Sequence, residues 1–88
     1  MKRFTRLRED GQAVLDAQGL ESGEAAARLK AFEDFYEHLL TRRQEIPAEL
    51  EALRREAKVK TVRFRELMTE QMMNGMIMDM LGMFGVRE

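Results

Sequence analysis

The most regular hydrophobic pattern of this chain lies in its last quarter, from Leu67 to Phe84. This segment reads LMTEQMMNGMIMDMLGMF and holds seven of the eight methionines. If it is a helix, its apolar residues form two neighbouring stripes, because residues three or four apart share a helical face. After Met72 only Asn74 and Asp79 are strongly polar, so the helix is apolar nearly all round. Such a helix must be buried on more than one side.

The two stripes make up a candidate protein interface. Its residues are Leu67, Met68, Met72, Met73, Met76, Ile77, Met80, Leu81 and Phe84. A chain of 88 residues has few helices with which to cover them, so we expect a homo-oligomer. An unidentified protein partner is the alternative, since methionine side chains adapt to varied surfaces. The run is shorter than the about 20 apolar residues of a membrane span, and we expect none.

A first amphipathic helix is predicted over residues 23–43. Its apolar residues recur every three or four positions from Leu29 to Leu40, which is the spacing of a helix with one buried face. Ser22 directly precedes this pattern and is a suitable N-cap, because its side-chain oxygen can accept a backbone N–H of the first turn.

A second helix is predicted over residues 47–57, since Pro47 suits a first helical turn. The Met-rich helix then covers 61–83, with Thr61 as its N-cap and a bend just before it. The apolar register also continues without interruption. The sequence therefore leaves open whether 47–83 is one bent helix or two.

The first 20 residues favour a short β-hairpin. Asp10 and Gly11 lie between two apolar runs, and both residues tolerate the positive φ that a type I′ turn requires. A helix from Thr5 to Gln18 is the competitor, but Gly11 in its middle would cost about 1 kcal/mol. The expected fold is mostly α: one small domain, 1–88, of about three helices with this short N-terminal hairpin.

Charge is unevenly distributed along the chain, although the net charge is only -1. Residues 21–53 are acidic, whereas 54–65 carry six basic side chains and one acidic side chain. The basic residues are Arg54, Arg55, Lys58, Lys60, Arg63 and Arg65. We expect them to pair with the acidic helix within a bundle or a dimer. The alternative is a nucleic-acid-binding accessory or regulatory protein that uses these cations as phosphate contacts. A helix-turn-helix motif is excluded, because it would bury Arg63 and Glu66.

The sequence offers no constellation for catalysis. It has no cysteine, no glycine-rich phosphate loop and a single histidine, His38, which borders an apolar face. We therefore expect no enzymatic activity, no catalytic residue, no cofactor and no metal site. No apolar segment follows Lys2 and Arg3, so we expect no signal peptide and a cytoplasmic location.

Two short motifs carry a resemblance to a known group of proteins. They read RLREDGQAV over residues 6–14 and RLKAFED over residues 28–34. Both resemble the start and the first helix of small proteins that phages and prophages of Firmicutes encode. The likeness ends after Asp34, where Phe35 and Tyr36 continue the helix. The resemblance implies an accessory role in a mobile element and supplies no binding residue.

Overall fold

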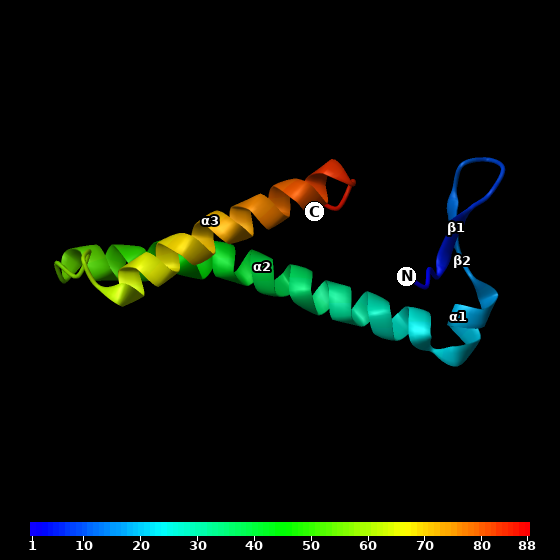
Figure 1. Ribbon diagram of the computed structural model, residues 1–88, viewed down its shortest axis with the longest axis horizontal. Coiled ribbons are helices and arrows are strands. Elements are labelled where there is room, and N and C mark those ends of the chain that lie inside the picture. Colours follow the sequence, from blue (N-terminus) through cyan, green and yellow to red (C-terminus); the bar gives the residue numbers. More distant parts are fainter. The chain divides into compact units, whose positions relative to one another are not determined.

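The computed structural model describes all residues, 1–88, and confirms a mostly helical fold with an N-terminal hairpin. The elements are β1 (Thr5–Leu7), β2 (Ala13–Leu15), α1 (Ala17–Ser22), α2 (Glu24–Arg55) and α3 (Val62–Met83) (Figure 1). The chain divides into two compact units, Met1–Tyr36 and Glu37–Glu88. No helix combines the length and the hydropathy needed to cross a lipid bilayer.

The N-terminal unit begins with the predicted hairpin. β1 and β2 are antiparallel, with Thr5 opposite Leu15 and Leu7 opposite Ala13. The turn differs from the predicted type I′, because only Gly11 has a positive φ, of 84°. Its N–H donates to the carbonyl of Arg8 over 2.9 Å, as in a three-residue loop that ends in a left-handed glycine.

A short helix, α1, follows the β-hairpin, before the first predicted helix. Phe4 is buried against this helix, and a Cβ on Gly19 would come within 2.6 Å of the Phe4 ring. Glycine is therefore required there by close packing rather than as a helix breaker. Ser22 ends α1, and its Oγ accepts the N–H of Glu24 over 3.3 Å, so the capping contact predicted for Ser22 is present.

The break predicted between residues 43 and 47 is absent, and α2 continues through Pro47. A proline inside a helix costs about 3 kcal/mol, since it removes one backbone hydrogen bond. Ile46 and Leu50 lie on either side of it and are both buried. Burying two such side chains stabilises the fold by about 1.5–3 kcal/mol each, which outweighs the cost of the proline.

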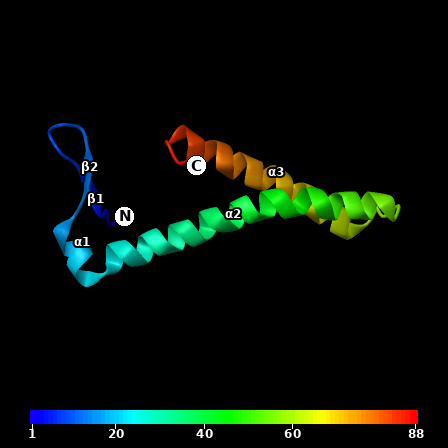
Figure 2. The same ribbon diagram turned by 180° about the vertical axis from the view of Figure 1, so that it is seen from behind.

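The second unit is a helical hairpin in which α3 runs back along the C-terminal part of α2 (Figures 1 and 2). Its core cluster consists of Ile46, Leu50 and Leu67, with Leu53 and Phe64 packed against it. The chain therefore reverses direction between the two helices instead of bending. Thr61 caps α3 as predicted, because its Oγ accepts the N–H of Phe64 over 3.2 Å.

The turn that follows α2 contains the only non-glycine residue with a positive φ, Ala57, at 58°. The N–H of Lys58 donates to the carbonyl of Leu53, and the N–H of Ala57 donates to that of Arg54. These two bonds form a Schellman motif, which places Ala57 at the position that glycine normally occupies. The same motif ends α3, and there the left-handed residue is Gly85.

We predict that Ala57→Gly stabilises the helical hairpin of α2 and α3. An alanine in the left-handed conformation destabilises the folded state by about 1–2 kcal/mol. Replacing it with glycine removes this strain, but it also makes the unfolded chain more flexible, which lowers the free energy of unfolding by about 0.4–1 kcal/mol. The free energy of unfolding should rise by about 0.5–1 kcal/mol. Urea unfolding followed by circular dichroism measures this change, with Ala52→Gly as the control inside α2. A loss of stability in Ala57→Gly would contradict the assignment of this cap.

Candidate interaction surface on helix α3

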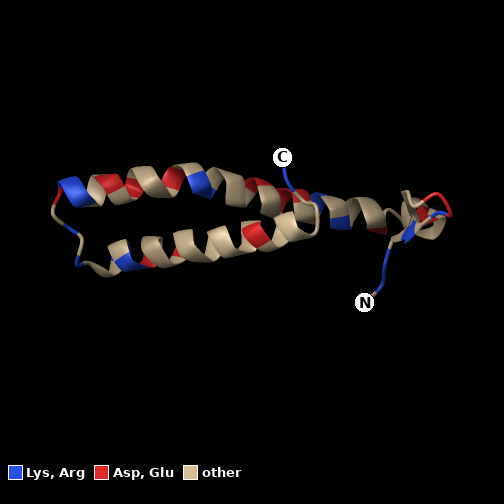
Figure 3. Ribbon diagram, turned by 90° about the horizontal axis from the view of Figure 1, so that it is seen from above, with Lys and Arg blue, Asp and Glu red and all other residues tan.

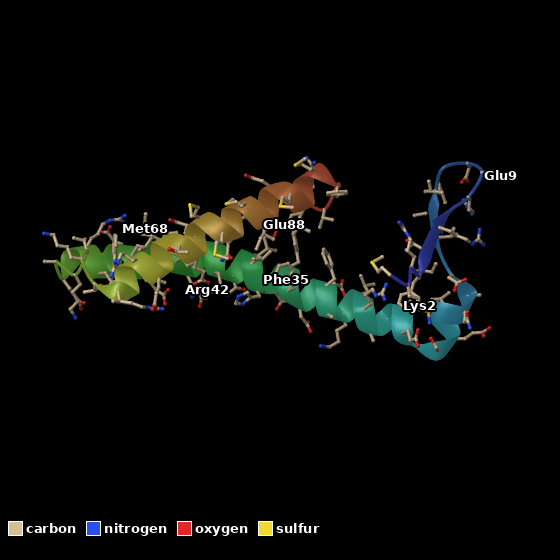
Figure 4. The ribbon with its side chains drawn as sticks, in the orientation of Figure 1. Lys2, Glu9, Phe35, Arg42, Met68 and Glu88 are labelled. Atoms are coloured by element: carbon tan, nitrogen blue, oxygen red, sulfur yellow. The ribbon has the colours of Figure 1, made fainter.

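Helix α3 has two chemically similar faces with different environments. The face toward α2 is fully or partly buried and consists of Phe64, Leu67, Asn74, Met78 and Leu81. The opposite side, which we call the outer face, consists of Met68, Met72, Met73, Met76, Met80 and Met83. Side-chain sulfur atoms follow α3 in Figure 4, where Met68 is labelled.

The outer face is exposed to solvent. The fractional exposure of its methionines lies between 42% for Met68 and 82% for Met83. Phe84, which directly follows α3, is 85% exposed. Large apolar side chains that are scattered singly over a surface are normal, but a contiguous row of them indicates an interaction site.

The structure divides the nine predicted interface residues into three groups. Leu67 is 1% exposed and belongs to the core of the hairpin, so its assignment to an intermolecular interface is wrong. Ile77 and Leu81 are half-buried. The other six lie exposed on or beside the outer face. Met83, which was not in the predicted set, is also exposed there, and its spacing of three from Met80 was the signal for it.

One polar network connects the two helices of the hairpin. Arg42 of α2 donates from Nε to Glu70 Oε2 over 2.7 Å and from Nη2 to Glu70 Oε1 over 2.9 Å. Glu45 and Glu49 also contact this guanidinium, each at 3.1 Å. The bidentate geometry holds α3 in register on α2, because two parallel hydrogen bonds fix direction as well as distance.

The same contact changes the acidity of Glu70. Hydrogen bonds from Arg42 are the largest cause that lowers the pKa of the Glu70 carboxyl below its ordinary value of 4.5, and partial burial opposes them. The side chain of Glu70 is 33% exposed, so solvent screens part of this interaction. Glu70 is nevertheless the carboxylate best suited to a positioning role in the hairpin.

The helical hairpin also contains a mostly apolar cleft between α2 and α3. The cleft has a volume of about 270 Å³, and its lining combines apolar residues, among them Leu39 and Met78, with the polar Arg43, Asn74 and Asp79. The Nδ2 atom of Asn74 is buried there without a hydrogen-bond partner. No group of three histidine, cysteine, aspartate or glutamate side chains that could hold a metal ion occurs in the chain.

The six predicted basic residues gather at the turn between α2 and α3 and beside it (Figure 3). Arg55 pairs with Glu51 at 3.5 Å, and Lys58 pairs with Glu56 at 3.3 Å. Arg63 lies 3.6 Å from Glu49 of the acidic segment. Only the contact of Arg63 with Glu49 joins this cluster to the acidic segment across the helical hairpin, because the pairs of Arg55 and Lys58 are local.

The remaining three basic residues have other surroundings. The guanidinium of Arg54 lies 5.5 Å from the centre of the Phe64 ring, a cation–π contact. Lys60 and Arg65 form no ion pair in the chain. The turn thus keeps two cations available for other contacts.

Comparisons of this chain with protein-family models, curated proteins and solved structures give no match.

We predict that Glu70→Gln removes part of the pH dependence of stability. Because the pKa of Glu70 is lowered on folding, its charge contributes stability above about pH 4.5, and this contribution is lost as the pH falls through the folded pKa. The difference between wild type and Glu70→Gln should therefore be largest at pH 7 and shrink toward pH 3. Urea unfolding at several pH values measures it.

The matched control is Glu66→Gln, since Glu66 lies one turn earlier on α3 and only approaches Arg63, at 3.9 Å. This substitution should change stability little at any pH. Equal effects of the two substitutions at pH 7 would contradict the role assigned to the contact between Arg42 and Glu70.

Proposed function

We propose that this chain is a non-enzymatic helical protein that self-associates through the outer face of α3. The observation that carries this proposal is the row of exposed methionines opposite the buried face of the same helix. A helix that is apolar on two sides needs a partner on each of them. Helix α2 supplies one, and a second copy of the chain supplies the other.

The small size of the core supports association. The buried hydrophobic residues are Phe4, Ala25, Leu39, Ile46, Leu50 and Leu67, and only the last four lie in the helical hairpin. A chain of this length removes a comparatively small share of its surface from water when it folds alone. Burying methionine surface in an interface adds stabilisation that grows with the apolar area removed from water, so association is the direct way to strengthen this fold.

Methionine also suits the outer face as an interface. Its unbranched side chain fills irregular gaps, so two methionine-rich faces can pack without a close match of shapes. The same property makes capture of a different protein the second outcome for this surface. In that case the outer face would be covered in the same way, and only the identity of the partner would change.

Nucleic-acid binding by the basic turn remains the alternative function, and two observations bear on it. The absence of ion pairs at Lys60 and Arg65 favours it, whereas the carboxylates near Arg55, Lys58 and Arg63 reduce the positive potential. The alternative predicts retention on DNA or RNA that falls steeply with salt concentration. The mobile-element accessory role that the N-terminal resemblance implies and the expected cytoplasmic location are compatible with either function.

We predict that Met76→Asp combined with Met80→Asp abolishes self-association. Two carboxylates in the interface would have to lose their hydration, which costs several kcal/mol for each ion. Sedimentation velocity should show a monomer where wild type forms a dimer or larger assembly, and the thermal midpoint should no longer rise with protein concentration.

A matched control adds the same charges to α2. Gln44 and Ala48 are exposed and have the same spacing of four residues. The double variant Gln44→Asp and Ala48→Asp should keep the assembly state of wild type. If the variant in α3 keeps its fold and its assembly state, the outer face is not the interface.

A further inference from the structure

Two exposed charges on α3, Arg65 and Asp79, lack a partner in the chain and flank the methionines from Met68 to Met78. Arg65 and Asp79 form no ion pair, although the other charged residues of α3, Arg63, Glu66 and Glu70, each do. Asp79 and Arg43 both line the cleft between α2 and α3, but they form no ion pair. Opposite charges thus stand free near the two ends of one helix.

The positions of these charges are symmetric about Met72. Arg65 precedes it by seven residues and Asp79 follows it by seven, and residues seven apart lie on nearly the same side of a helix. At a rise of 1.5 Å per residue, each charge lies about 10.5 Å from Met72 along the axis. Arg65, Met72 and Asp79 therefore form one straight stripe with a cation at one end and an anion at the other.

We propose that two copies of this chain associate through antiparallel α3 helices, with the two-fold axis at Met72. This inference rests on the proposed self-association and specifies its geometry. Arg65 of each copy then faces Asp79 of the other, because a two-fold axis exchanges positions at equal distances on its two sides. Met68 faces Met76 of the second copy in the same way, and Met72 faces its own equivalent.

The charges select this arrangement over a parallel one. In a parallel pair, Arg65 would face Arg65 and Asp79 would face Asp79, and like charges across an interface are unfavourable. Antiparallel packing turns both repulsions into attractions and also aligns the helix dipoles favourably.

Gly75 agrees with close packing at the centre of the stripe. A Cβ at Gly75 would meet no atom of the chain within 4 Å, so nothing inside the hairpin requires a glycine there. A glycine in a helix costs about 1 kcal/mol relative to alanine. In the antiparallel pair Gly75 lies about one turn from Met72 at the edge of the contact, where the lack of a side chain allows the helices to approach closely.

Charge reversal tests this pairing. Arg65→Asp alone should raise the dissociation constant about tenfold at low salt, because it replaces two attractions with two repulsions. Asp79→Arg alone should do the same, and the double variant should restore the affinity of wild type. Arg6→Asp, an equal change of charge at an exposed and unpaired residue of β1, is the control and should have no effect. Failure of the double variant to recover affinity would overturn the proposed pairing.

Cysteine cross-linking tests the same arrangement independently, because the natural chain contains no cysteine. Met72→Cys should form a disulfide-linked dimer under mild oxidation. Met80→Cys should not, since the two copies of residue 80 would lie about 24 Å apart along the axis, far beyond the reach of a disulfide. A parallel dimer would cross-link through both positions.

The outcomes separate this proposal from the one on which it rests. Suppose that wild type is a dimer, but that Met72→Cys and Met80→Cys cross-link equally well, or that only Met80→Cys does. This result overturns the antiparallel arrangement and leaves self-association intact. A wild-type monomer overturns both. Circular dichroism of every variant confirms that α3 is still folded before its association is compared.

Discussion

The packing of α3 on α2 is the constraint on which the rest of the second unit depends. Ile46, Leu50 and Leu67 exclude water from the centre of this contact, and the bidentate pair of Arg42 with Glu70 sets its register. The apolar contact is not directional, so it stabilises the hairpin without selecting one alignment. The ion pair adds the direction, because its geometry is satisfied at only one relative position of the two helices. Both terms also determine which side of α3 is left exposed.

The composition of α3 makes this exposed side the main candidate interaction surface of the chain. One partner helix can cover only about half of a helix, and α3 is apolar on both halves. The buried half is filled by Leu67 and its neighbours, whereas the outer half presents methionines together with two unpaired charges, Arg65 and Asp79. A surface of this kind combines a non-directional attraction with an electrostatic pattern. Such a pattern contributes specificity and orientation more than raw affinity.

The features that could be predicted from the sequence are those that local chemistry determines. Gly11 indicated the N-terminal β-hairpin. Thr61 indicated the N-cap of α3, and the apolar spacing indicated the length of α3. The continuity of α2 through Pro47 was missed, because the local preference of proline for a first turn was outweighed by the burial of Ile46 and Leu50. The contact between Arg42 and Glu70 joins residues 28 positions apart, and no local pattern indicates it. Leu67 points inward because α2 covers that side of α3. The sequence of a helix that is apolar all round does not indicate which side its partner helix covers.

The most direct test of self-association through α3 is the molar mass of the wild-type chain in solution. Light scattering during size-exclusion chromatography, at moderate and at high salt, measures it. Self-association through α3 predicts at least twice the 10.3 kDa of one chain. The assembly should persist at high salt, since burial of apolar surface is not screened. A mass of 10.3 kDa at every concentration and salt level would contradict self-association.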